Sequence, residues 1–203
     1  VVGSVDFSHH LNRFASDFHD EKSVATIQNF VFQDVEKLEI DSPPSIYTLL
    51  RYLELRGAQE VVATPTNSAT LSGNLASEEV TSYVSAHFMN GAASEAGPVF
   101  STLYVPTGFQ DFESIEGIEG NFLRGFDGIE KYDRDFLNTL EVGDPDDPDM
   151  QYVIGEILYE HGEARYFIFP FNDHGLLSYK NALEACAKVL QKRKITNDCS
   201  FYR

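Results

Sequence analysis

The residues of this sequence with the clearest chemical potential lie in a short polar stretch near the carboxyl end. Asn172-Asp-His-Gly175 follows an expected strand and precedes an expected helix, a place where a rigid scaffold often holds functional polar groups. His174 and Asp173, with a carboxylate such as Glu156, could carry out acid–base chemistry, so a hydrolase or metal-assisted enzyme is one candidate function. An Asx-type helix cap explains the same residues with fewer assumptions, and nothing in the sequence brings a nucleophile to His174.

A second candidate site is the acidic loop 143–149, which contains two prolines and four carboxylates: Asp144, Asp146, Asp147 and Asp149. Ca²⁺ takes roughly six to eight oxygen ligands, and closely spaced carboxylates in a loop can supply several of them. The spacing does not match the helix-loop-helix calcium pattern, which needs a central Gly and a terminal Glu. A solvated acidic turn is therefore favoured over a Ca²⁺ site, and Ca²⁺ is the only candidate cofactor.

The histidines elsewhere give weaker signals. His9, His10 and His19 gather near the amino end, but adjacent histidines cannot face one ligand from a regular helix, and no H-x-x-x-H or H-E-x-x-H spacing occurs. His87 falls on the apolar face of an expected helix, where a hydrogen-bonded core histidine is favoured over a catalytic one. His161 is expected to be exposed at the tip of a hairpin.

Two other patterns are better explained by structure than by chemistry. The sequence lacks the Gly-x-Ser-x-Gly of nucleophilic hydrolases, and the glycines of segment 117–128 fit no dinucleotide or phosphate-loop template. Four phenylalanines in and just before this segment could form a lid over an apolar cavity, although core positions are favoured: Phe109, Phe112, Phe122 and Phe126.

The two cysteines, Cys186 and Cys199, are expected on the last helix and at the start of a last strand that folds back along it. This geometry can bring their Cα atoms to the separation of about 5.5 Å that a disulfide needs. A bridge would add about 3 kcal/mol in the chain-entropy model and would indicate an oxidising compartment, periplasmic or extracellular. Two buried free thiols in a cytosolic protein are the alternative.

Composition limits the candidate partners. The chain of 203 residues has 15 basic and 32 acidic side chains, a formal net charge of −17, which disfavours nucleic acid and anionic membranes. No apolar run approaches the roughly 18 residues of a spanning helix. The start at Val1, without Met or a signal peptide, suits either a processed mature end or an artificial boundary. The sequence leaves the oligomeric state open.

The elements that must position these residues mix helical and strand patterns without regular βαβ alternation. Helical periodicity or capping signals predict helices at about 5–18, 21–38, 46–55, 77–89, 129–140 and 176–190. Aromatic and β-branched residues predict strands at 59–64 and 98–105, a hairpin formed by 151–159 and 164–171, and a short last strand with Cys199.

These elements predict one α+β domain over residues 1–203, with a helical part at 1–57 and a sheet with covering helices at 58–203. The expected architecture is an antiparallel sheet packed on one face by several helices, with the last helix and strand tied by the disulfide. The favoured function is an exported domain that binds a small ligand or a protein partner between sheet and helices. An enzyme using His174 and Asp173, or a structural subunit of a larger assembly, are the alternatives.

Overall fold

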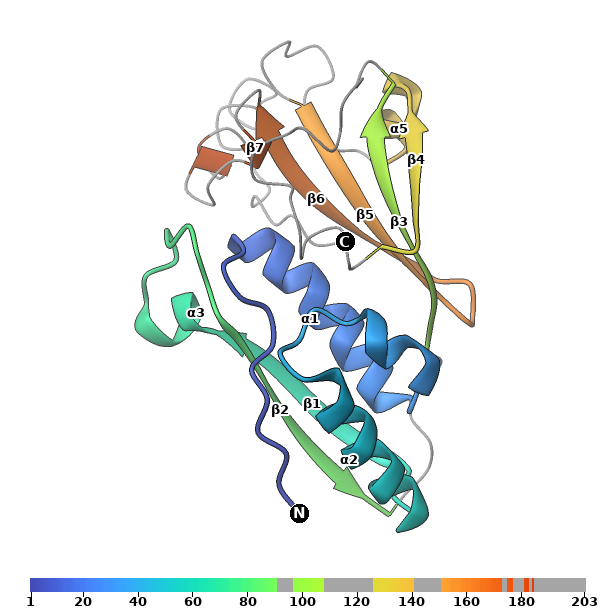
Figure 1. Ribbon diagram of the computed structural model, residues 1–203. Helices are drawn as coiled ribbons and strands as arrows, with labels where there is room; N and C mark the ends of the chain where they lie inside the picture. Colours follow the sequence, from blue (N-terminus) through green and yellow to red (C-terminus); the bar gives the residue numbers. More distant parts are fainter. Residues whose placement is uncertain are drawn as a thin grey trace.

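The computed structural model describes residues 1–90, 97–107, 126–140, 151–172, 175–176, 181–182 and 184. These residues form helices and two β-sheets, which confirms the predicted α+β class. Figure 1 shows the long helix α1 (Arg13–Gln28) lying between the two sheets. Both cysteines of the expected disulfide, Cys186 and Cys199, lie outside the described residues.

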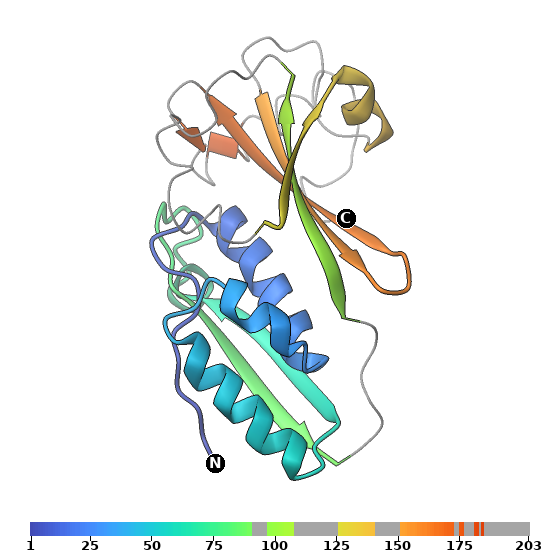
Figure 2. The ribbon, with the colours of Figure 1, turned by 45° about the vertical axis from the view of Figure 1, so that its right-hand side comes forward.

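The smaller sheet pairs β1 (Glu60–Asn67) with β2 (Ser82–Met89) in antiparallel register. Its inner face packs against α1 and α2 (Pro43–Leu55), with Val61 buried against Ile27 and Leu50. Figure 2 shows both helices on the same side of this two-stranded sheet.

The expected helix at 77–89 is wrong, because this segment forms β2. Its apolar residues Val84, Ala86 and Phe88 alternate with polar ones, and this period of two places them against the small-sheet core. His87 lies on the opposite, exposed side of the strand, so it is not the core histidine that a helix would have made it.

The larger sheet has five strands in the order β4-β3-β5-β6-β7. The strands are β3 (Pro98–Pro106), β4 (Gly128–Tyr132), β5 (Gln151–Tyr159), β6 (Ala164–Asn172) and β7 (Gly175–Leu176). The β5–β6 hairpin and β3 confirm predictions, and Gly162 turns the hairpin with a φ of 86°. The sheet is not wholly antiparallel, since β4 pairs with β3 in parallel. β4 also replaces the first residues of the helix expected at 129–140, of which α5 (Arg134–Thr139) forms the rest.

Helix α1 replaces the two helices expected over residues 5–38. It begins after Asn12, whose side chain accepts a hydrogen bond from Ala15 N, and it ends at Gln28, with Asn29 as its C-cap. Before it, the chain is extended and follows β2, with Phe7 N donating to Ser82 O. After it comes the short 3₁₀ helix η1 (Phe32–Lys37). The helix expected at 46–55 is confirmed as α2, and α3 (Ser68–Ser72) follows β1.

Each face of the larger sheet carries a helix, where one covered face was expected. On one face, Phe18 of α1 is fully buried among side chains of β5 and β6, and it stacks on Phe126 at 4.4 Å between ring centroids. This confirms the core role expected for Phe126. On the other face, Phe136 and Leu137 of α5 pack against Tyr132 and Ile154.

Close approach of α1 to this sheet depends on Gly155. A Cβ atom at this position would lie 2.9 Å from Phe169, 3.1 Å from Phe126 and 3.1 Å from Phe18. Real Cβ atoms do not tolerate contacts as short as the first, and buried rings have little room to move. Within the described part of the chain, no helix has the length and apolar character needed to cross a membrane.

We expect Gly155→Ala to lower the free energy of unfolding by about 1–3 kcal/mol, because the added methyl group overpacks the aromatic core. Chemical denaturation followed by circular dichroism would measure this loss. Ser85→Ala, on the exposed face of β2, should change the value by less than about 0.5 kcal/mol. Equal stability of Gly155→Ala and the natural protein would show that α1 does not depend on this contact.

Candidate functional site

The strongest candidates from the sequence lie outside the described residues: the catalytic pair Asp173 and His174, and the acidic loop with Asp144, Asp146, Asp147 and Asp149. His87 is exposed on β2, in the smaller sheet, whereas the strand that leads to Asp173 belongs to the larger one. His161 is exposed at the hairpin tip, as predicted, 3.0 Å from Glu163. The described candidates therefore do not come together.

Glu156 forms the centre of a polar group on the larger sheet, on the face that carries α5. Tyr104 Oη of β3 donates to Glu156 Oε2 at 3.2 Å. Tyr166 is the direct partner of Glu156 on β6, and this carboxylate helps to raise the pKa of the Tyr166 phenol. Two neighbouring strands therefore hold one half-buried carboxylate between two phenols.

The electrostatics of this group keep both phenols protonated. Burial, together with the charge of Glu156 and the hydrogen bond to it, raises the pKa of Tyr104 to about 12. Burial, the hydrogen bond to Glu156 and its charge raise the pKa of Tyr166 to about 12. Both side chains are therefore hydrogen-bond donors at neutral pH, which orients the carboxylate.

The surrounding sheet face is acidic and aromatic. Glu130 of β4 lies in register with Tyr104, and Phe100 of β3 is 44% exposed with its ring over Gly128. The two basic residues of β4, β5 and β6 point to the opposite face, because Lys131 is in register with Val105 and Arg165 with Ile157. No basic side chain of these strands therefore lies on the same face as Glu156 to balance its charge.

A second polar group is buried between α1 and β3. Lys22 Nζ donates to Ser101 Oγ at 2.9 Å and lies 3.8 Å from Asp127 Oδ2. Asp127 also accepts from Ser101 N and Oγ, at 2.9 and 2.8 Å, and from Lys37 Nζ at 2.8 Å. This network joins α1, η1 and the start of β4 to β3.

In this network, burial and the neighbouring charges shift each pKa in opposite directions. Burial lowers the pKa of Lys22, although Asp127 and Asp34 act in the opposite direction. Burial alone would raise the pKa of Asp127, but the hydrogen bond from Lys37, the charge of Lys22 and the donors of Ser101 together hold it below its usual value. Asp127 is therefore the carboxylate that compensates a buried ammonium group.

A lysine that donates to a serine hydroxyl is one arrangement that can activate a nucleophile. Here Ser101 is only 1% exposed, and its own hydroxyl hydrogen is directed to Asp127. A substrate carbonyl could not approach Ser101 Oγ in this arrangement. The group therefore acts as a structural clamp between α1 and the larger sheet.

The opposite side of α1 buries a third polar group. Asp20 Oδ1 accepts from Ser82 Oγ of β2 at 2.6 Å. Burial raises the pKa of Asp20 to about 8, against the lowering effect of the Ser82 hydrogen bond, with Asp17 and Glu39 adding to the rise. Next to it, burial and the charge of Lys22 lower the pKa of His19 to about 3, so this histidine is neutral and does not act as a proton shuttle near neutral pH.

Sequence reasoning named Glu156 only as an accessory carboxylate and did not identify Lys22, Ser101 or Asp20. The partners of Glu156 are adjacent only after strand pairing, although aromatic residues alternating on three strands gave a partial signal. Lys22 is one of five charged residues in α1, so the local pattern did not mark it for burial.

We expect Asp127→Asn to lower the free energy of unfolding by about 3 kcal/mol, because it leaves the ammonium group of Lys22 buried without its counter-charge. Asp133→Asn is a matched control, since exposed Asp133 accepts from Phe136 N at the start of α5 and Asn caps a helix equally well. Urea denaturation of both variants would measure the difference. Similar values for the two would mean that the clamp contributes little.

The raised pKa of Asp20 predicts a specific pH dependence. Its folded value of about 8 lies above the usual value of 3.8, so its contribution to stability is complete below about pH 4 and is lost as the pH rises towards 8. We expect the natural protein to lose stability relative to Asp20→Asn across this window, by at most about 1.4 kcal/mol per pH unit. Thermal denaturation of both proteins from pH 5 to 8 would test this, and a constant difference would contradict it.

Comparison with known proteins gives no match: no protein-family model fits this chain, and no curated protein or solved structure is significantly similar to it. Function is therefore inferred from the side chains and their geometry.

Proposed function

We propose that this chain is a binding domain whose ligand is a small organic cation with a primary ammonium group, bound at Glu156 on the larger sheet. The observation that carries the proposal is the half-buried carboxylate of Glu156, which accepts from Tyr104 and lies opposite Tyr166 on a sheet face where the described strand residues place no basic side chain. This keeps the expected role of a ligand-binding domain and names the kind of ligand.

The hydrogen-bonding capacity of Glu156 supports this ligand. An ionised carboxylate has about four acceptor positions, and the phenol of Tyr104 uses one of them. An ammonium group carries three donors and no acceptor, so it can fill the remaining positions and compensate the charge. An anionic ligand would instead meet both Glu156 and Glu130.

Aromatic side chains beside Glu156 support binding of the organic part of such a ligand. Phe100 is the exposed ring on this face, and the Tyr104 ring lies 4.7 Å from that of Phe136 in α5. An ammonium group within about 6 Å of a ring centroid gains roughly 0.5–1 kcal/mol at an exposed site. An exposed aromatic ring on the same face as a carboxylate suits an alkylamine.

The net charge of the whole chain also favours a cationic ligand. A formal net charge of −17 attracts cations and raises their local concentration at acidic surfaces. Export to an oxidising compartment remains part of the proposal and depends on pairing of Cys186 with Cys199. Neither the enzyme alternative nor the assembly alternative gains a specific observation from the described residues.

We expect n-butylamine to bind at Glu156 and Glu156→Gln to weaken this binding at least about tenfold, since a charge-assisted hydrogen bond is worth roughly 1.5–3 kcal/mol. Phe100→Ala should weaken it by a factor of about two to five, as loss of an exposed cation–π contact implies. Two-dimensional NMR titration at neutral pH and low salt would measure both affinities and locate the shifted resonances.

Glu36→Gln is the matched control, because it removes the same charge from an exposed position on η1. Butyrate is the control ligand, with a similar alkyl chain and the opposite charge. The proposal is wrong if Glu156→Gln binds butylamine as well as Glu36→Gln does, or if butyrate binds as tightly as butylamine.

A further inference from the structure

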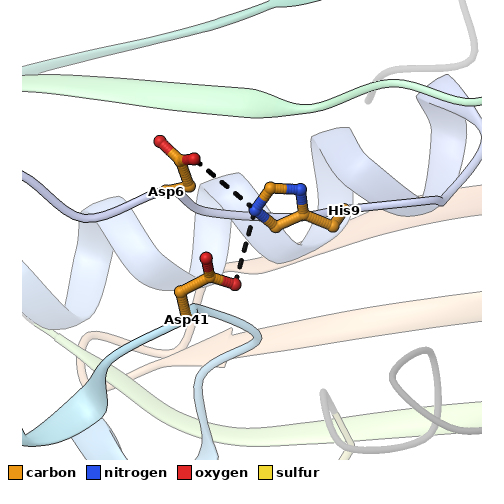
Figure 3. A group of neighbouring side chains, drawn as sticks. All are labelled: Asp6, His9 and Asp41. Atoms are coloured by element: carbon orange, nitrogen blue, oxygen red, sulfur yellow. Dashed lines mark ion pairs between the residues drawn. The ribbon is translucent and has the colours of Figure 1, made fainter.

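Three side chains with metal-binding atoms converge where the N-terminal segment meets the chain just before α2. Asp6 and His9 come from the extended segment that precedes α1, and Asp41 comes from the turn after η1. Asp41 N donates to Asp6 O at 3.0 Å, which fixes the two segments together. Figure 3 shows the three side chains facing one another, and one ligand atom from each lies within 4.8 Å of the others.

The distances within this group are longer than those of hydrogen-bonded ion pairs. His9 Nε2 lies 3.4 Å from Asp41 Oδ1 and 3.9 Å from Asp6 Oδ2. A charge-assisted N–H···O bond is typically about 2.7–2.9 Å. Tetrahedral Zn²⁺ with bonds of about 2.0–2.1 Å places its ligand atoms roughly 3.3–3.4 Å apart. The first distance matches this spacing, and the second exceeds it by about 0.5 Å.

The orientation of His9 is the one found in metal-binding histidines. Its Nδ1 atom lies 3.4 Å from Thr81 Oγ1, a contact that holds the ring and leaves Nε2 directed towards the two carboxylates. Nε2 is buried and makes no hydrogen bond to any described residue. Histidine ligands usually bind the metal through one nitrogen while the other contacts a polar group of the protein.

A buried carboxylate lies beside the group but is not part of it. Glu39 is only 6% exposed, and burial raises its pKa, against the lowering effects of the Ser8 side chain and of the charge and backbone N–H of His9. The ligand atoms that converge therefore come from Asp6, His9 and Asp41 alone among the described residues.

From these contacts we infer that Asp6, His9 and Asp41 form a binding site for a divalent transition-metal ion of the Zn²⁺ type. An imidazole nitrogen disfavours Ca²⁺ and Mg²⁺, which prefer oxygen ligands, and favours the later first-row metals. Three protein ligands leave a fourth position for water. The bound ion would fix the N-terminal segment to the start of α2. This inference is independent of the ammonium site at Glu156.

The competing explanation is that the three side chains form only loose polar contacts and bind no ion. It makes the opposite prediction, because titration would then detect no tight metal binding. Occupancy by metal can therefore be measured directly, without reference to the ligand of the larger sheet.

Isothermal titration of the full chain with Zn²⁺, and with Co²⁺ followed by visible absorption, tests the site. We expect one high-affinity Zn²⁺ site and a Co²⁺ spectrum typical of four-coordinate geometry. His9→Gln should weaken binding by roughly 100-fold or more, and Thr81→Val by roughly 10–100-fold, as loss of an outer contact does in known sites. Ca²⁺ at the same concentration should not compete.

His10→Gln is the matched control, because its side chain contacts exposed Glu79 at 3.3 Å and takes no part in the group. It should bind Zn²⁺ as the natural protein does. The inference is overturned if no Zn²⁺ or Co²⁺ binding is detected, if His9→Gln and His10→Gln bind equally, or if Ca²⁺ displaces Zn²⁺. The last result would place the bound ion in an all-oxygen site elsewhere on this acidic chain.

Discussion

Burial of α1 between two sheets is the constraint on which the other described elements depend. Helix α1 contacts β1 and β2 on one side and β3 and β6 on the other, so it cannot present a solvated face along most of its length. Close contact with the larger sheet requires a position without a side chain, and Gly155 provides it beneath Phe18. A helix in this position contributes side chains to the cores of both sheets, so neither core is complete without it.

The same constraint explains the charged residues inside the fold. Asp20 and Lys22 are two positions apart, and a helix turns by about 100° per residue, so they point to opposite sides of α1. Asp20 reaches Ser82 in the smaller sheet, whereas Lys22 reaches Ser101 in the larger one. Each is buried and each has a specific partner. Such pairs add little net stability compared with apolar residues, but they favour one register of α1 between the sheets.

Local sequence patterns predicted the elements that bury only one face and those bounded by a turn with Gly or Pro. The β5–β6 hairpin, β3 and α2 were found, because aromatic alternation, Gly162 and Pro43 are local signals. The segment at 77–89 was misassigned, since Val80, Val84 and Phe88 also fit a helical spacing and only pairing with β1 decides between the two. The start of α1 was misplaced because Phe7 and Leu11 share the helical stripe, but backbone bonds hold Phe7 to Ser82 of β2 and Leu11 to Val80 just before β2.

Both proposed sites are formed by residues far apart in the sequence, which is why their parts gave no motif. Glu156 meets Tyr104 across 52 positions of sequence, and His9 meets Asp41 only because the chain returns after η1. In one site, a carboxylate accepts a hydrogen bond from a phenol. In the other, two carboxylates face an imidazole of fixed orientation. A net charge of −17 attracts any cation to either place, so the local geometry must discriminate between them. An imidazole lone pair selects a transition metal, whereas a carboxylate beside aromatic rings selects an organic ammonium group.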